Sequence, residues 1–225
     1  MKIIKLSLLF LIAISFSNSS LGQISDKQFG DILQSYYLNK DKYLIDKTID
    51  FVNNTNMDYK SLTPILTGFF GALFLNDTIA KTNFISHLNK VEKPDLKALL
   101  NTLASSNIDS IYSHAKISAQ FNDMNWSSFF STGKTKYLDN IIANLLYSEN
   151  RTDINLFFAG ATAKWSLCSN SKQDKKVKLY LTSLQDSNKT IKEILGKDQQ
   201  FFREEMISIL KQQNAKGIWN QYNYR

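Results

Sequence analysis

The chain has 225 residues, of which 43% are hydrophobic and 21% are charged. This length and balance are typical of a folded chain, with one globular domain or two small ones that share an interface, and exclude an intrinsically disordered chain. Eight glycines and two prolines are too few for the many turns of an all-β sandwich, and a single cysteine excludes an internal disulfide.

The first 22 residues have the order of a secretory signal peptide. Lys2 and Lys5 precede an apolar run over residues 6–16, and a short polar stretch leads to Gly22. The apolar run is shorter than the roughly 20 residues that span a bilayer. We therefore expect cleavage after Gly22 and export to the bacterial periplasm or beyond. The mature chain, residues 23–225, is expected to have no transmembrane segment.

Cleavage would also lower the net charge. It removes two lysines and no acidic residue, so the formal charge falls from +7 to +5. The remaining basic residues are spread along the chain and form no polybasic block. Together with export, this argues against a nucleic-acid partner.

Apolar residues recur at intervals of three and four along the mature chain, which is the period of an amphipathic helix. They predict helices over residues 26–36, 41–53, 61–75, 77–88, 94–103, 108–121, 137–146, 154–168, 177–184 and 201–210. Ser61 or Thr63 is expected to cap the third helix, with Pro64 in its first turn. Gly68 and Gly71 in that helix would let another helix approach closely.

The predicted fold class is all-α. Helices of this length joined by short turns form antiparallel hairpins, which stack either as an irregular solenoid or as a compact bundle. A tetratricopeptide array would need a repeat of about 34 residues, and no strict repeat is present. Trp126, Phe129, Gly133 and Tyr137 follow one another in tetratricopeptide-like order, but with a different spacing. Both architectures stay open, with residues 23–225 as a single domain.

Two segments stand out as a pattern. The first, over residues 126–137, has the order W…FF-x-TG…Y, and the second, over residues 161–167, contains A-x-WSL. Over residues 123–181 the chain resembles a family of uncharacterised, exported bacterial helical proteins that carries both segments in this order. The resemblance implies an all-helical fold and export. It implies no activity, cofactor or partner.

The aromatic residues of these segments have a packing interpretation. We expect Trp126, Tyr137 and Trp165 to be mostly buried, with Gly133 in the turn between two helices. Small residues around Gly160 would let their helix lie close to a neighbour. The alternative is an aromatic groove that binds a ligand.

A candidate binding surface combines these aromatic residues with basic ones. Its members are Trp126, Tyr137, Lys164, Trp165, Lys175 and Lys176. The basic cluster that contains Lys175 and Lys176 is either a solvated helix face or a contact for lipid headgroups or an acidic partner.

No metal site or cofactor site is recognisable. Metal ligands on a helix lie three or four residues apart. Neither His87 nor His114 has a His, Cys, Asp or Glu at those positions. Cys168 lies at the end of an apolar segment and is expected to be buried and inert. We therefore expect no metal and no cofactor.

Catalysis would have to use carboxylates. Glycan-cleaving enzymes need a pair of them, and the acids nearest to the aromatic segments are Asp123, Asp139, Glu149 and Asp153. Spacing alone identifies no pair. The sequence therefore favours an exported, non-catalytic helical module that binds a protein or peptide. The alternatives are an envelope hydrolase with paired carboxylates and a peripheral protein of the envelope surface.

Overall fold

The computed structural model describes residues 24–219, and the regular structure among them is entirely helical. The predicted all-α fold is thus confirmed. None of the described helices has the length and apolar character needed to cross a membrane. The predicted signal peptide, residues 1–22, lies outside the described residues.

The described chain divides into two compact units. The N-terminal unit comprises residues 24–116 and 123–137, and the C-terminal unit comprises residues 117–122 and 138–219. The helix that contains residue 123 therefore contributes to both units. Each unit has its own central helix and is described by itself.

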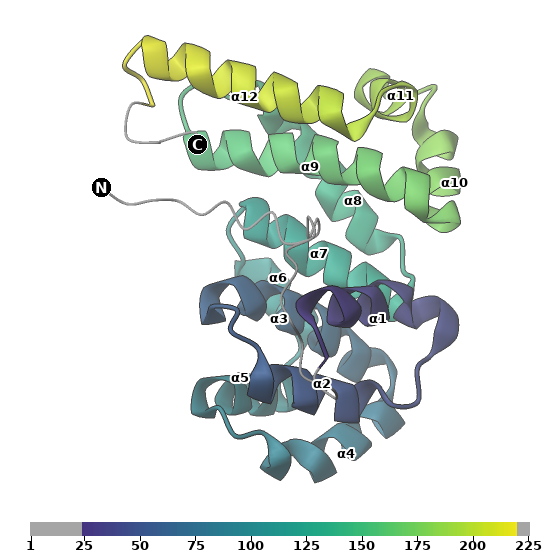
Figure 1. Cartoon of the computed structure of the whole chain (residues 1–225). Helices are drawn as coiled ribbons and strands as arrows, with labels where there is room; N and C mark the ends of the chain where they lie inside the picture. The colour runs from purple at the N-terminus through teal and green to yellow at the C-terminus, as the bar shows by residue number, and fades with distance from the viewer. Residues whose placement is uncertain (1–23, 220–225) are drawn as a thin grey trace. The chain divides into compact units, whose positions relative to one another are not determined.

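The N-terminal unit is built around one apolar helix. Its helices are α1 (Asp26–Asn39), α2 (Leu44–Asn54), α3 (Tyr59–Asn76), α4 (Thr78–His87), α5 (Pro94–Ser105), α6 (Ile108–His114) and most of α7 (Ala119–Thr132), with a 3₁₀ turn η1 (Leu88–Lys90). Helix α3 contacts α4, α5 and α6 (Figure 1). Residues 64–74 of α3 are all buried, as expected for a helix that is hydrophobic on every face.

Two glycines of α3 permit close packing, as the sequence predicts. A Cβ atom on Gly68 would lie 2.1 Å from the carbonyl oxygen of Met124 in α7, and one on Gly71 would lie 2.7 Å from the Ile108 side chain. The hydroxyl of Ser128 donates a hydrogen bond to the Gly68 carbonyl at 2.8 Å. Helix α7 therefore packs on α3 at backbone distance.

The start of α3 differs from the prediction. Asp58 is the N-cap, and its carboxylate accepts hydrogen bonds from the Ser61 N–H at 3.0 Å and the Ser61 hydroxyl at 2.7 Å. Neither Ser61 nor Thr63 caps the helix, and Pro64 lies inside it. Aspartate caps a helix at least as well as serine or threonine does, so α3 begins earlier than its apolar residues indicate.

The helix predicted over residues 108–121 is two helices. Helix α6 ends at His114, and α7 begins at Ala119. The Ser118 side-chain oxygen accepts a hydrogen bond from the Phe121 N–H at 3.2 Å. Serine competes with the helix for backbone donors, and here it begins a new helix instead of continuing the old one.

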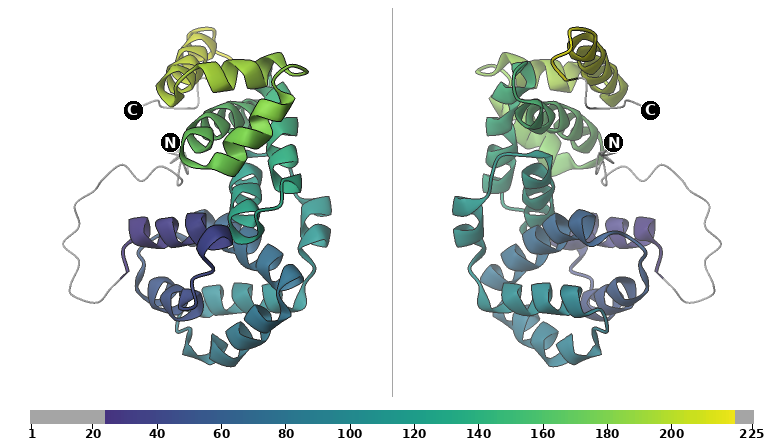
Figure 2. Two further views of the ribbon diagram at one scale, coloured as in Figure 1. Left: turned by 90° about the vertical axis from the view of Figure 1, so that its right-hand side faces the viewer. Right: turned by 90° about the vertical axis from the view of Figure 1, so that its left-hand side faces the viewer.

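The C-terminal unit also surrounds a central helix. Its helices are α8 (Lys136–Ala143, from residue 138 on), the 3₁₀ helix η2 (Asn144–Glu149), α9 (Ile154–Gln173), α10 (Lys175–Leu184), α11 (Lys189–Gly196) and α12 (Gln199–Ala215). Helix α9 contacts η2, α10, α11 and α12, and α12 runs alongside it (Figures 1 and 2). After α12, Trp219 packs against Phe157 of α9, with the ring centroids 5.1 Å apart.

Helix α9 meets η2 at backbone distance. A Cβ atom on Gly160 would lie 2.0 Å from the backbone nitrogen of Ser148. A buried chain of amides joins the same elements, since Asn144 donates to Asn122 at 2.7 Å and Asn122 donates to the Ala159 carbonyl at 2.8 Å. The predicted close approach near Gly160 is confirmed, and η2 is its partner.

Gly160→Ala tests this contact. The added methyl group has no space, so η2 must move away from α9, and overpacking of this kind costs about 1–3 kcal/mol. We expect the free energy of unfolding, measured in urea, to fall by an amount in this range, about 1–3 kcal/mol. Gly30→Ala is the control, because a Cβ atom there meets nothing within 4 Å; it should be neutral or stabilising. Equal stability of the two variants would contradict the packing argument.

Candidate functional site

The aromatic residues of the candidate surface lie in the interior. Trp126 and Tyr137 are each 1% exposed, and Trp165 is 8% exposed. Gly133 lies between α7 and α8 with φ of 69°, the left-handed conformation that favours glycine. The packing interpretation is confirmed for these residues, and they do not form an exposed aromatic groove.

The six candidate residues do not belong to one unit. Trp126 and Tyr137 are part of the N-terminal unit, whereas Lys164, Trp165, Lys175 and Lys176 are part of the C-terminal unit. Lys175 and Lys176 are exposed at the start of α10, directly after its N-cap Asp174. Lys164, by contrast, is buried.

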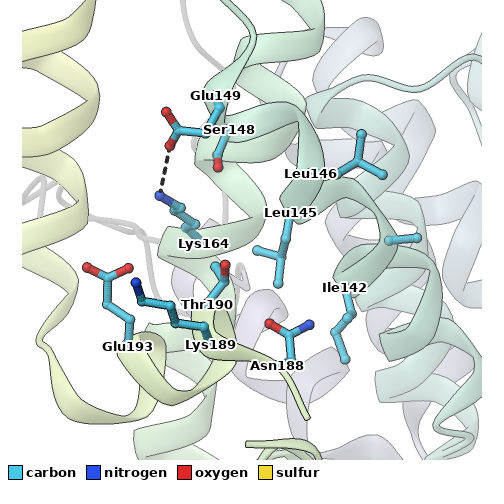
Figure 3. A pocket seen from close by; sticks show the side chains of 11 residues that line it. Ile142, Leu145, Leu146, Ser148, Glu149, Lys164, Asn188, Lys189, Thr190 and Glu193 are labelled. Carbon is cyan, nitrogen blue, oxygen red and sulfur yellow. Dashed lines mark ion pairs between the residues drawn. The ribbon is translucent and has the colours of Figure 1, made fainter.

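Lys164 projects from α9 into a buried position. Its side chain is 7% exposed, and the ammonium nitrogen lies 3.3 Å from Glu205 Oε2 and 3.6 Å from Glu149 Oε1. Figure 3 shows the pair with Glu149. Arg151 also binds Glu149, at 2.9 Å between Nη2 and Oε2. A buried ammonium group without a counter-charge would cost several kcal/mol. The carboxylates of Glu149 in η2 and Glu205 in α12 therefore stabilise Lys164 in this buried position.

A pocket of about 580 Å³ opens beside Lys164 (Figure 3). Its apolar wall comes from the end of α8 and from η2: Ile142, Ala143, Leu145 and Leu146. A polar wall comes from α11 and the residue before it: Asn188, Lys189, Thr190 and Glu193. Ser148, Glu149 and Lys164 complete the lining. Ligand pockets typically measure about 300–1,000 Å³ and combine apolar walls with a few polar groups.

Helix α11 supplies the polar wall, and it is absent from the helices that the sequence predicts. Asn188 is its N-cap and accepts a hydrogen bond from the Ile191 N–H at 3.1 Å. Ile191 and Ile194 are fully buried, which turns Lys189 and Glu193 toward the pocket. A cap followed by apolar residues three apart is a helix signal, but eight residues are too few for a clear period.

The acids proposed for catalysis have other roles. Asp153 is the N-cap of α9, Asp139 accepts a hydrogen bond from the Tyr180 hydroxyl, and Glu149 pairs with basic residues. Asp123 is partly buried, and desolvation raises the pKa of its carboxyl group to about 7. Burial is the cause of that shift.

Other reactive groups are engaged locally. No cluster of three or more metal-ligating side chains occurs within residues 24–219. The Nδ1 atoms of His87 and His114 each lie 2.9 Å from the carbonyl oxygen four residues earlier in their own helix. Cys168 is buried, burial raises the pKa of its thiol, and the thiol contacts the Lys197 carbonyl at 3.4 Å. Its predicted burial is confirmed.

Comparison with protein-family models, with curated proteins and with solved structures finds no match to this chain. The resemblance over residues 123–181 therefore stays a prediction. The role of the pocket has to be argued from its own residues.

The ion pairs of Lys164 make a direct stability prediction. Changing Glu149→Gln together with Glu205→Gln leaves the buried ammonium without a counter-charge, and we expect a loss of about 3 kcal/mol in the free energy of unfolding. Adding Lys164→Met should recover most of that loss, because an apolar side chain of similar length needs no partner. Urea denaturation at neutral pH measures both.

An exposed pair provides the control. Lys27 and Asp31 lie 2.7 Å apart with both side chains more than half exposed, so Asp31→Asn should cost less than about 1 kcal/mol. If the double glutamine variant is no less stable than this control, the carboxylates do not hold Lys164 in place.

Proposed function

We propose that the protein is an exported, non-catalytic module whose C-terminal unit binds a peptide, or a peptide segment of another protein, in the pocket beside Lys164. One observation carries the proposal: an accessible apolar wall faces a wall of charged and hydrogen-bonding side chains. Leu146 in the apolar wall is 68% exposed. A peptide offers the complementary chemistry, because it alternates apolar side chains with polar backbone groups.

The state of the acidic residues supports binding over catalysis. General acid–base catalysis near neutral pH needs a group of matched pKa within hydrogen-bond reach of the substrate. In the pocket, Glu149 is held by Lys164 and Arg151. Asp153 and Asp139 serve a helix cap and a tyrosine hydroxyl instead. Asp123, the acid whose raised pKa would suit such catalysis, does not line the pocket. Substrate turnover in the pocket would therefore need a group other than the acids that the sequence suggests.

Leu146→Asp tests the binding site. Peptides selected from a random display library against the mature protein should lose at least tenfold in affinity for this variant, because a carboxylate replaces apolar contact area. Leu179→Asp is the matched control: Leu179 is 61% exposed on α10 and does not line the pocket. Calorimetric titration measures both.

Three results would contradict the proposal. One is a library that yields no binder, and another is equal affinity of the two aspartate variants. The third is hydrolysis of peptidoglycan, glycan or peptide substrates by the purified protein, because it would establish an enzyme.

Export has its own test. If residues 1–22 are a signal peptide, protein recovered from the native host begins at Gln23. N-terminal sequencing of that material checks the cleavage site. Intact Met1 on cytoplasmic protein would contradict the assignment of compartment but not the pocket.

A further inference from the structure

The polar wall of the pocket carries one basic and one acidic group that the fold does not use. Lys189 and Glu193 are four residues apart on α11, and both line the pocket (Figure 3). Within residues 24–219, neither side chain has a hydrogen bond or an ion pair with another residue. Both charges are therefore available to a ligand.

Lys164 has spare hydrogen-bonding capacity at the same place. An ammonium group has three N–H donors. In the described part of the chain, the hydrogen bond to Glu205 at 3.3 Å is its one direct hydrogen bond, and the Glu149 oxygen at 3.6 Å is beyond hydrogen-bond distance. An oxygen atom of a ligand that reaches this ammonium group would accept a charge-assisted hydrogen bond in place of water.

The charges of the lining are balanced. Lys164 and Lys189 carry two positive charges, and Glu149 and Glu193 carry two negative ones. Lys164 and Glu149 already pair with each other and with Glu205 and Arg151, so Lys189 and Glu193 are the lining charges that remain for a ligand. A ligand with a single net charge would be repelled by one of these two residues, whereas a zwitterion pairs with both. Complementary charge of this kind selects ligands by rejecting those of the wrong sign.

The volume of the pocket and its apolar wall restrict the class of possible ligands further. About 580 Å³ lies within the range of pockets that enclose ligands larger than a single amino acid. Leu145 and Leu146 offer an apolar surface for an aliphatic side chain. A di- or tripeptide with both ends free combines a carboxylate, an ammonium group and aliphatic side chains in one molecule.

Building on the proposed function, we infer that the pocket binds short, free-ended peptides with aliphatic side chains. The terminal carboxylate lies against Lys189 and the free N–H groups of Lys164. The terminal ammonium group pairs with Glu193, and an aliphatic side chain packs on Leu145 and Leu146.

Calorimetric titration with a defined tripeptide tests this inference. The probe is alanyl-leucyl-alanine, compared with its N-acetylated form and its C-terminally amidated form, on purified residues 23–225. We expect the free-ended peptide to bind, and each blocked form to bind at least tenfold more weakly, because each lacks one of the two charges.

Two variants test which charged residue binds each end of the tripeptide. In Lys189→Met, amidation of the C-terminus should weaken the affinity for the peptide less than threefold. In Glu193→Gln, acetylation of the N-terminus should weaken that affinity less than threefold. Lys211→Met and Glu204→Gln are the controls, because both residues are exposed on α12 and neither lines the pocket; they should leave the preference unchanged.

The inference fails if the blocked and free peptides bind equally, or if none of the three tripeptides binds. It also fails if the controls change the preference as much as Lys189→Met and Glu193→Gln do. The proposed function is tested separately from this inference. Library-selected peptides and the Leu146→Asp variant test peptide binding in the pocket, and neither test requires the peptide to have free termini.

Discussion

The C-terminal unit depends on the backbone contact between Gly160 of α9 and Ser148 of η2. With no side chain at Gly160, the two backbones approach to a distance that a single Cβ atom would prevent. That approach brings Glu149, the residue after Ser148, within 3.6 Å of Lys164 one turn further along α9. It also sets Leu145 and Leu146 along the edge of the pocket. One missing side chain therefore positions both the ion pair and the apolar wall.

Burial of the Lys164 ammonium group costs free energy because the charge loses its hydration. Its ion pairs offset this cost, but they do not explain why a lysine occupies this position. A buried pair seldom stabilises a fold more than apolar residues of the same volume would. The charge does, however, lie beside a pocket and retains donors that the fold leaves unused. A cost in stability is reasonable where a buried charge orients a ligand.

The side chains around the central helix of each unit differ in chemistry: they are apolar around α3, whereas charged ones gather around part of α9. In the N-terminal unit, α3 is buried on all sides, and Phe70, Phe74 and Phe84 pack together with ring centroids 5.0–5.6 Å apart. This is the composition of a structural core. In the C-terminal unit, charged side chains of three helices meet around Lys164. The side chains to which the proposed function assigns ligand binding therefore lie on η2, α9 and α11.

The sequence by itself determined the all-helical fold, the turn at Gly133 and the burial of Trp126 and Tyr137. These features follow from the helical period and from the conformational freedom of glycine, which act over a few neighbouring residues. Only the tertiary structure decided the site. Lys164 lies 41 residues from Glu205 along the chain, and helix α11 was too short to be recognised. Whether such side chains meet depends on which segments pack together and how closely. The small residues around Gly160 predict a close neighbour, but they do not say that the neighbour is Ser148 of η2.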